Sequence, residues 1–514
     1  MDRITDAMDD MVVSEKLAAA REYETKNEIA ANDRPLFHVS PAVGWMNDPN
    51  GFSVYGGRIH LLYQYHPYST EWGPMHWGHQ VTDDMMKWEQ LPVALAPDTE
   101  YDAEGCFSGT AMELDGKHVL VYTSVMKKTE GEGVFQNQSI AVGDGITYKK
   151  IDGNPVVTGD MLPDGLSRVD FRDPKVWFDD DRYYMAAGCV DHDDKGLVVL
   201  FSSQDMASWT FESILARNDR DLGGVWECPD FFKMGDCYVL LVSPTGMQAD
   251  GYEFHNGNNS VYFVGEFDKE SGKFDGEKAY SLDYGTDFYA PQTTLLPDGR
   301  RILIAWMDSW HNLWIPDGQR WQGMMTLPRE ISIKNGMLIQ NPIREIEKYY
   351  DDTVVYSEEN VCGHRTFEGI CGRYVDMTVT VKEAEYDNFT VELAKGDRYS
   401  TRFTYSRRDG RMELDRSLAG FERDVVCIRK AKMKICQCTN EQDCGNSSAD
   451  SNTYKEVIKL RFILDRNSIE LFVNDGLMTM STVIYTPIEY EGMEFSCDGK
   501  AVVDIEKHSI KIEC

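Results

Sequence analysis

Three acidic residues lie in unusual local sequences that are widely separated along the chain. These sequences are Trp45-Met-Asn-Asp48-Pro-Asn-Gly51, Phe171-Arg-Asp173-Pro174 and Trp226-Glu227-Cys-Pro-Asp230. Taken alone, Asp48 is typical of a turn, and Asp173 beside Arg172 is typical of a structural ion pair. Brought to one cavity, three carboxyl groups would raise one another's pKa, so that one stays protonated near neutral pH while another is ionised. Cleavage of a glycosidic bond requires that pair of states.

The three acids belong to a longer periodic series. Its members Asp48, Phe107, Asp173, Glu227 and Asp287 are 59, 66, 54 and 60 residues apart. A second pattern, Asp-x-x-x-aromatic, repeats with a similar period at Asp84, Asp144 and Asp205. A period of this size is typical of a four-stranded propeller blade with long loops. Five such units fill roughly 38–335, which predicts five blades that hold the acids at equivalent depth around one axis.

The rest of the sequence also favours β-structure. From Phe37 onward, short β-type runs are separated by Gly, Asp and Pro clusters, which is typical of an all-β domain. After about Ile346 the repeat stops, and alternating apolar residues in 458–464 and 468–473 predict a hairpin of an antiparallel sandwich. We therefore predict an all-β fold in three parts. They are an N-terminal helical leader (1–35) with a short helix from Ser14 to about Ala31, a five-bladed β-propeller (36–345) and a C-terminal β-sandwich (346–514).

The charge balance excludes two classes of partner. The 514 residues include 52 Lys and Arg against 86 Asp and Glu, a net charge of −34. Nucleic acids and anionic membranes need a basic surface, so neither is expected as a partner. The acidic N-terminus is unlike a secretory signal, and no apolar run reaches the roughly 18 residues of a membrane span. Because 12 cysteines are too sparse for a disulfide scaffold, we expect a soluble cytoplasmic protein with free thiols.

Four of the cysteines lie close together near the C-terminal end. They are Cys427, Cys436, Cys438 and Cys444. They could hold zinc, but they form no Cys-x-x-Cys pair, and the lysines at 430, 432 and 434 favour a solvated strand edge instead. We predict no metal and no organic cofactor.

Aromatic and amide side chains near the acids suit a sugar ligand, since rings stack on sugar faces and amides bind hydroxyls. Some of these rings must also serve as core. The candidates are Trp45, Trp72, Trp77, Phe107 and Trp306, with Asn47 and Gln64 for the hydroxyls.

With these motifs, the chain resembles family 32 of the glycoside hydrolases, the invertase and β-fructofuranosidase family. The Trp45–Gly51 segment matches that family's best-known segment without a gap or substitution. Further landmarks follow in order: Tyr63–Pro67, Trp72–His79, Phe107–Gly109, Phe171–Pro174, Glu227–Asp230, Phe288–Gln292 and Ala305–Met307. The resemblance covers about 36–345 strongly and the tail, through Leu464–Gly476, more loosely.

The resemblance implies retaining hydrolysis of terminal β-D-fructofuranosides, from sucrose, sucrose 6-phosphate or short fructo-oligosaccharides, without a cofactor. It implies that Asp48 is the nucleophile, Glu227 the general acid/base and Asp173 the transition-state stabiliser. The sugar contacts that it implies are Asn47, Gln64, Trp72, Phe107, Ser108, Arg172 and Trp306, with Thr245 and Asp287 as weaker candidates.

Other interpretations remain open at this point. A fructosyltransferase would use the same covalent intermediate with a sugar as acceptor, whereas a non-catalytic sugar-binding propeller would be expected to lack one carboxylate. The helical leader and the form of Trp72–His79 resemble bacterial sucrose or sucrose-6-phosphate hydrolases. A phosphorylated substrate would need a local basic pocket, and the sequence identifies no such cluster. The sandwich could also pair subunits in a homo-oligomer.

Overall fold

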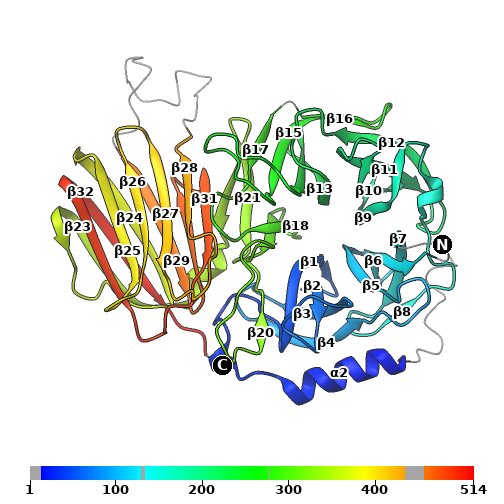
Figure 1. The fold of residues 1–514 in the computed structure, drawn as a ribbon, viewed down its shortest axis with the longest axis horizontal. Helices are drawn as coiled ribbons and strands as arrows, with labels where there is room; N and C mark the ends of the chain where they lie inside the picture. Colours follow the sequence, from blue (N-terminus) through cyan, green and yellow to red (C-terminus); the bar gives the residue numbers. More distant parts are fainter. Residues whose placement is uncertain (1–12, 129–132, 277, 435–456, 514) are drawn as a thin grey trace.

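The computed structural model describes residues 13–128, 133–276, 278–434 and 457–513. Its first element is helix α2 (Glu15–Asn27), whose N-cap Ser14 accepts a hydrogen bond from Leu17 N–H. The helix ends earlier than the predicted Ala31, because the chain turns so that Ile29 becomes buried and its N–H donates to Ala42. The helix lies beside β4, at the outer edge of the first blade (Figure 1). No helix in the described part of the chain is long and apolar enough to cross a membrane.

The described residues up to 342 form five consecutive antiparallel sheets, as the sequence period predicts (Figure 1). Blade 1 contains β1 (Gly44–Tyr55), β2 (Arg58–His66), β3 (His76–Thr82) and β4 (Glu89–Leu95). Blade 2 contains β5 (Gly105–Leu114), β6 (Lys117–Lys127), β7 (Val134–Gly143) and β8 (Tyr148–Lys150). Blade 3 contains β9 (Leu166–Asp179), β10 (Arg182–Asp191), β11 (Gly196–Ser203) and β12 (Trp209–Arg217).

The last two blades have less regular outer strands. Blade 4 contains β13 (Trp226–Met234), β14 (Cys237–Pro244), β15 (Val261–Asp268), β16 (Lys273–Asp275) and β17 (Ala279–Ser281). Blade 5 contains β18 (Tyr289–Leu295), β19 (Arg301–Trp306), β21 (Arg329–Lys334) and β22 (Met337–Pro342). The short β20 (Trp321–Gln322) leaves blade 5 and pairs in parallel with β1 of blade 1. The inner strands β1, β5, β9, β13 and β18 contact one another in a closed ring, so the five-bladed propeller is confirmed.

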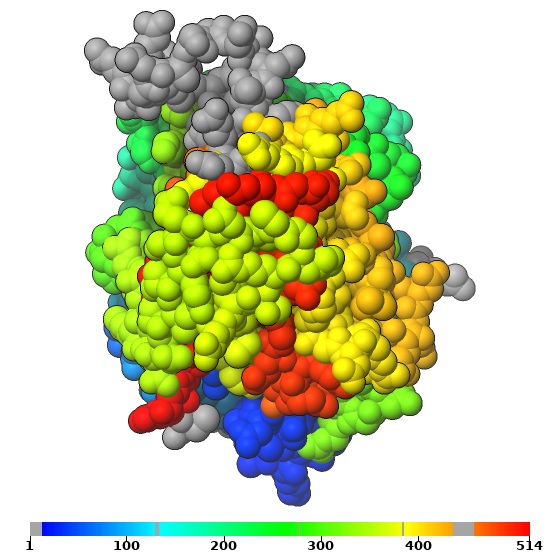
Figure 2. Space-filling view, turned by 90° about the vertical axis from the view of Figure 1, so that its left-hand side faces the viewer, coloured from blue at the N-terminus to red at the C-terminus, as the bar shows by residue number. Residues whose placement is uncertain are grey.

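The tail forms ten strands joined into one continuous sheet that folds into two layers. They are β23 (Tyr350–Arg365), β24 (Val375–Glu385), β25 (Asn388–Lys395), β26 (Ser400–Ser406), β27 (Arg411–Leu418), β28 (Ile428–Lys432), β29 (Ile458–Asp465), β30 (Ser468–Val473), β31 (Met478–Val483) and β32 (Gly492–Ile510). The long β32 pairs first with β25 and then with β24, and so passes from one layer to the other. Figure 2 shows β23 and β32 side by side on the outer end of this sandwich. Phe403 and Phe462 meet between the layers, as expected for the predicted sandwich.

A buried ionic network joins the propeller to the sandwich. Arg329 on β21 pairs with Glu470 on β30 at 2.5 Å and with Asp283 at 3.2 Å. His38 bridges Glu470 and Asp465, at 2.9 and 2.8 Å. Burial lowers the pKa of His38, but the hydrogen bonds that it donates to its two acidic partners, together with their charges, outweigh burial and raise that pKa to about 9. The two parts of the molecule are therefore joined by paired charges inside a dry interface.

Candidate active site

The five innermost strands each carry a β-bulge at the level of the predicted site. In β1, β5, β9, β13 and β18 the pairing register shifts against the neighbouring strand at this level. A bulge adds one residue to one strand and re-aims a side chain, which is why bulges are common beside active sites. Each bulge contains one of the residues Asp48, Ser108, Asp173, Cys228 and Ala290, and four of the bulges contain one further residue, which is Asn47, Pro174, Pro229 or Pro291.

The local sequence explains the bulges. Proline directly follows the bulge residue in four of the five strands, and proline is tolerated there because a bulge releases a backbone N–H from the ladder. Asp173, Cys228 and Ala290 have positive φ angles of 64°, 48° and 51°. Such backbone costs about 1–3 kcal/mol per residue and persists only where the surroundings hold it. The same strained geometry therefore recurs in three successive blades.

Asp48 and Asp173 are joined through Cys228. The Cys228 N–H donates to Asp173 Oδ2 at 3.0 Å, and its thiol donates to Asp48 Oδ2 at 3.4 Å. The Ser108 hydroxyl also donates to Asp48 Oδ2, at 2.7 Å. The other oxygen, Asp48 Oδ1, is buried and has no hydrogen-bond partner within standard distance and angle among the described residues, although the nearby Asn47 amide lowers the pKa of the carboxyl. One oxygen of Asp48 is thus fixed by two donors while the second remains available.

Glu227 lies beside Cys228 and is held by two donors from other strands. Arg172 donates to Glu227 Oε1 from Nη2 at 2.9 Å and from Nε at 3.2 Å. The Tyr289 hydroxyl donates to Glu227 Oε2 at 2.6 Å. The sequence suggested that Arg172 supports Asp173, but its Nε is 4.0 Å from Asp173 Oδ2, beyond hydrogen-bond distance. Arg172 therefore hydrogen-bonds Glu227 and affects Asp173 through its charge.

Burial dominates the electrostatics of the site. It raises the pKa of Asp173 to about 7, with the charges of Glu227 and Asp48 adding to the rise and Arg172 opposing it. Burial also raises the pKa of Asp48, and the charge of Glu227 adds to this, while the hydrogen bond from Ser108 lowers it. The three carboxylates therefore interact with one another, as expected for acids that share a site.

An aromatic cluster supports the carboxylates from below. The rings of Trp45, Trp306 and Trp310 contact one another, with Trp45 6.0 and 5.8 Å from the other two and these 5.0 Å apart. Cys228 and Tyr289 pack on the same cluster. Trp306, predicted as a sugar contact, is fully buried in this position. It is placed to fix Trp45 and Trp310 rather than to stack on a ligand.

The other predicted sugar contacts take several positions near the carboxylates. Asn47 accepts a hydrogen bond from Trp45 Nε1 at 2.7 Å, and its amide helps to lower the pKa of Asp48. The Gln64 amide donates to the Cys106 carbonyl at 3.0 Å. At the rim, Trp72 meets Phe107 edge to face at 5.9 Å and is 48% exposed, so its ring is open to a ligand. Trp77, by contrast, is fully buried core.

The structure places Asp287 away from the carboxylates, which corrects its assignment as a sugar contact. Asp287 is fully buried against the sandwich, where its carboxylate pairs with Arg416 and accepts hydrogen bonds from Val483 N–H at 2.8 Å and Asn312 at 3.3 Å. Asp287 entered the periodic series of the sequence only because it lies 60 residues after Glu227. In blade 5, the residue at the position that Asp48 and Asp173 occupy in their blades is Ala290. Thr245, the other weak candidate, follows β14 and reaches Val225 through its backbone N–H at 3.0 Å. Within the described part of the chain, Thr245 makes no hydrogen bond to Asp48, Asp173 or Glu227.

Three residues of the site were not predicted: Cys228, Tyr289 and Trp310. Cys228 lies within the Trp226–Asp230 motif and Tyr289 within Phe288–Gln292. The proline that closely follows each of them could have identified them in the sequence. Pro49, Pro174, Pro229 and Pro291 mark equivalent positions in four blades. Aligned on these prolines, Glu227 corresponds to Arg172 and Tyr289 rather than to Asp173.

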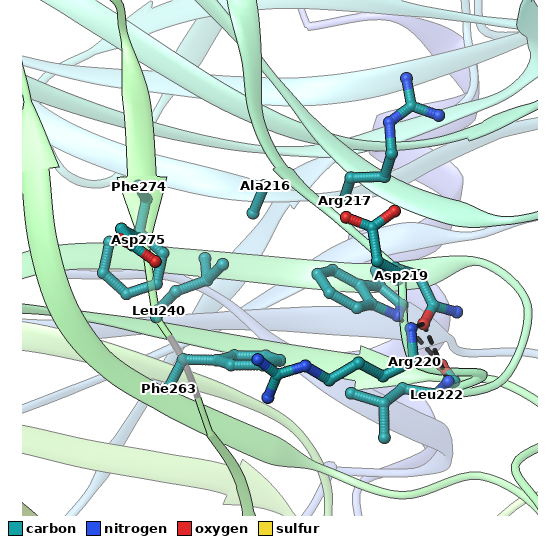
Figure 3. A pocket seen from close by; sticks show the side chains of 12 residues that line it. Ala216, Arg217, Asp219, Arg220, Leu222, Leu240, Phe263, Phe274 and Asp275 are labelled. Carbon is teal, nitrogen blue, oxygen red and sulfur yellow. Dashed lines mark hydrogen bonds between the residues drawn. The ribbon is translucent and has the colours of Figure 1, made fainter.

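A cavity of about 230 Å³ lies between blades 3 and 4, apart from the carboxylates (Figure 3). Trp226, Phe263 and Leu240 line its floor, and Arg220 and Asp219 lie at its edge. Consecutive strand residues point to opposite faces, so Trp226 faces this cavity while Glu227 faces the site. The cavity therefore lies on the opposite face of the strand that carries Glu227, and none of the three carboxylates lines it.

Within the described residues, no group of three or more His, Cys, Asp or Glu side chains has the arrangement of a metal site. Of the four clustered cysteines, Cys427 is partly buried and free, and the other three lie outside the described residues. The zinc interpretation of that segment is therefore not tested by the structure.

Comparison with known proteins identifies the family. A model of the N-terminal domain of glycosyl hydrolases family 32 matches residues 38–342, and a model of the C-terminal part of that family matches 345–512. A sucrose-6-phosphate hydrolase of Escherichia coli is 34% identical over 483 residues, covering 91% of this chain and 93% of the relative. A raffinose invertase of Escherichia coli is 34% identical over 478 residues, with the same coverage of both chains.

A solved structure agrees with this assignment. The family 32 β-fructofuranosidase of Bombyx mori superposes with a TM-score of 0.81 at 30% identity, over 96% of this chain and 98% of that one. A variant of that silkworm enzyme has been solved in complex with sucrose. The chain therefore belongs to glycosyl hydrolase family 32.

Proposed function

We propose that this protein is a retaining β-fructofuranosidase that releases terminal fructose from sucrose and related fructosides. The observation that carries the proposal is the state of Asp48. Ser108 and Cys228 both donate to its Oδ2, and no described residue hydrogen-bonds the buried Oδ1. A carboxylate oriented by one oxygen and free at the other is suited to form a covalent bond through the free oxygen.

In the first step, Asp48 Oδ1 attacks the anomeric carbon of the fructosyl ring. The bond from that carbon to the leaving oxygen breaks, and the proton of Glu227 passes to the leaving oxygen. Arg172 and Tyr289 then stabilise the Glu227 carboxylate that remains, since each already donates to one of its oxygens. Asp173, with Oδ2 fixed by the Cys228 N–H, is placed to bind fructosyl hydroxyls and the positive charge that develops on the ring.

In the second step, Glu227 removes a proton from water, and the resulting hydroxide attacks the same carbon. The ester bond to Asp48 breaks and fructose leaves with its configuration retained. The relatives named sucrose-6-phosphate hydrolase and invertase support sucrose and its 6-phosphate as substrates. The complex of the silkworm variant with sucrose supports a small disaccharide in this site.

Asp48→Asn tests the proposal. It should lower kcat on sucrose by roughly 10³–10⁶-fold, the scale seen when a nucleophile is removed. Asp144→Asn is a matched control, because Asp144 caps an exposed turn through the Ile146 and Thr147 N–H groups. Both variants should fold like the parent by circular dichroism. A near-normal rate for Asp48→Asn would show that another group is the nucleophile.

Product analysis of the parent at high sucrose separates water from sugar as the acceptor. Hydrolysis predicts equal release of glucose and fructose. Glucose in clear excess, with kestose-type trisaccharides, would instead make the protein a fructosyltransferase.

A further inference from the structure

We propose that the N-terminal helix α2 positions part of the rim of the carboxylate site, because Tyr23 on the helix holds Tyr68 in the loop 67–75. This loop connects β2 with β3 and carries Trp72, whose ring is 48% exposed at the rim. The inference rests on the proposed function and goes beyond it, since it makes residues outside the site determine how tightly the sugar substrate binds. Tyr23 and Tyr68 act only through Trp72 and are therefore positioning residues.

Trp72 lies two contacts away from the proposed nucleophile. Its ring meets Phe107 edge to face, with the centroids 5.9 Å apart. Phe107 directly precedes Ser108, whose hydroxyl donates to Asp48 at 2.7 Å. The position of Trp72 therefore sets part of the surface that a sugar bound at Asp48 meets.

Two histidines hold the loop on either side of Trp72. The His66 Nδ1–H donates to the Glu71 carbonyl at 3.0 Å, and the His76 Nδ1–H donates to the Pro74 carbonyl, also at 3.0 Å. A carbonyl oxygen only accepts, so each ring carries a hydrogen on Nδ1. The backbone that carries Trp72 is thereby fixed from both ends of the loop.

Gly73 lets the chain pass close to one of these rings. A Cβ added at Gly73 would lie 2.4 Å from His66 Cε1 and 2.5 Å from His66 Nδ1. At such distances either the ring or the loop would have to move. The path of the chain directly after Trp72 therefore depends on where the His66 ring lies.

Tyr68 joins the two histidines to the helix. Its ring meets the rings of His66 and His76 edge to face, each 5.9 Å away. On helix α2, Tyr23 meets Tyr68 edge to face at 5.0 Å. Aromatic pairs of this geometry attract each other beyond the effect of their buried area. Because Tyr68 is 43% exposed, its position depends strongly on these three rings.

Helix α2 is itself attached to the outer part of blade 1. Leu17 and Ala20 are buried on its inner face. The Arg21 Nε–H donates to the Val93 carbonyl on β4 at 2.9 Å. Tyr23 therefore projects from an anchored element and gives Tyr68 a fixed support.

The KM for sucrose tests the proposal. Tyr68→Ala should raise KM about two- to ten-fold, the range that corresponds to aromatic pairs, and should leave kcat within about twofold, because it removes binding rather than chemistry. Tyr68→Phe keeps the ring and should behave like the parent.

Tyr55→Ala is the matched control for a general loss of stability. Tyr55 is also a tyrosine of blade 1 that packs on a histidine, since its ring stacks on His118 at 4.8 Å. It lies at the opposite end of the β1–β2 pair from His66. This variant should leave the KM for sucrose unchanged.

A double-mutant cycle shows whether the effect passes through Trp72. Trp72→Ala should itself raise KM, and adding Tyr68→Ala to it should raise KM by less than about twofold more, because the side chain that Tyr68 positions is already absent. Should Tyr68→Ala not fold, Tyr23→Ala makes the same measurements from the helix side, and KM should rise in the same way.

An unchanged KM in the tyrosine variant, an equal rise in Tyr55→Ala, or additive effects of the tyrosine variant and Trp72→Ala would each overturn the proposal. In those cases the release of fructose by the parent stands. A parent without activity on sucrose would instead refute the proposed function.

Discussion

Replacing Asp173 with asparagine tests how strongly burial and the neighbouring carboxylates oppose ionisation of Asp173. Burial raises the pKa of Asp173 from 3.8 to about 7, and the charges of Glu227 and Asp48 contribute to the rise. At about 1.4 kcal/mol per pKa unit, the ionised side chain destabilises the native state by up to about 4 kcal/mol. Asparagine removes that charge, keeps an oxygen for the Cys228 N–H and tolerates the positive φ of 64° at this position.

The sign of the effect depends on pH. A carboxyl whose folded pKa lies above its unfolded pKa stabilises the folded protein below pH 4, and this contribution is lost as the pH rises through about 7. Asp173→Asn should therefore match the parent in stability near pH 4 and exceed it at pH 8. For a chain of this length, about 4 kcal/mol corresponds to a rise in Tm of about 4 °C. The same variant should lose most of its fructose release.

Thermal unfolding followed by circular dichroism at pH 4.5 and pH 8 measures the difference. Asp230→Asn is a matched control, since Asp230 is also buried in the propeller but lies 3.0 Å from Lys175 Nζ. Removing its charge leaves a buried ammonium unpaired, so this variant should be less stable at both pH values. An Asp173→Asn protein that is no more stable than the parent at pH 8 would refute the claim that burial and neighbouring charges make the ionised Asp173 unfavourable.

Three further perturbations follow from the same contacts. Glu227→Gln should be least impaired on substrates with a good leaving group, because protonation then matters less; equal loss across a series of aryl fructosides would contradict an acid role. Ser108→Ala removes the 2.7 Å hydrogen bond to Asp48 and should lower kcat/KM about ten- to a hundred-fold, measured on sucrose; a loss under twofold would contradict that bond. His38 has a pKa of about 9 in the folded protein. Its protonation therefore stabilises the folded state fully below the unfolded pKa of about 6.5, and this stabilisation is lost as the pH rises through about 9. Urea titration should therefore show that the unfolding free energy of the parent falls between pH 7 and 9.5, and that the His38→Gln variant shows no such fall. A fall of equal size in the variant would contradict this role of His38.

The blade architecture was predictable because the repeat that defines it is visible in the local sequence. Strand and turn patterns recur about every 60 residues, and each blade must bury both faces against its neighbours, so period and fold go together. The helix at Glu15–Asn27 was also predictable from its cap at Ser14. Its end was not, since burial of Ile29, a tertiary contact, determines where the chain turns.

The sequence predicted that Asp48, Asp173 and Glu227 come together, and the structure groups them, but their register within the inner strands was not predictable. A count of spacing assigned Asp287 to the inner ring, although the structure places it against Arg416 in the sandwich. The bulges shift the equivalent positions by one to three residues, and only the prolines that follow Asp48, Asp173, Cys228 and Ala290 reveal the shift. Contacts that join distant segments, such as those of the Cys228 thiol with Asp48 and of the Cys228 N–H with Asp173, have no sequence period and could not be predicted.

The bulge positions also explain why this site uses three carboxylates and no more. If all five inner strands carried an acid in the bulge, the charges would meet in a buried space, and each would raise the pKa of the others. Here Ser108 and Ala290 are uncharged, and Cys228 donates to both neighbouring aspartates instead of adding a third charge to the ring. The third acid, Glu227, is displaced by one residue. That displacement places it between Arg172 and Tyr289, so Glu227 is held by donors from two other strands while the two aspartates share Cys228.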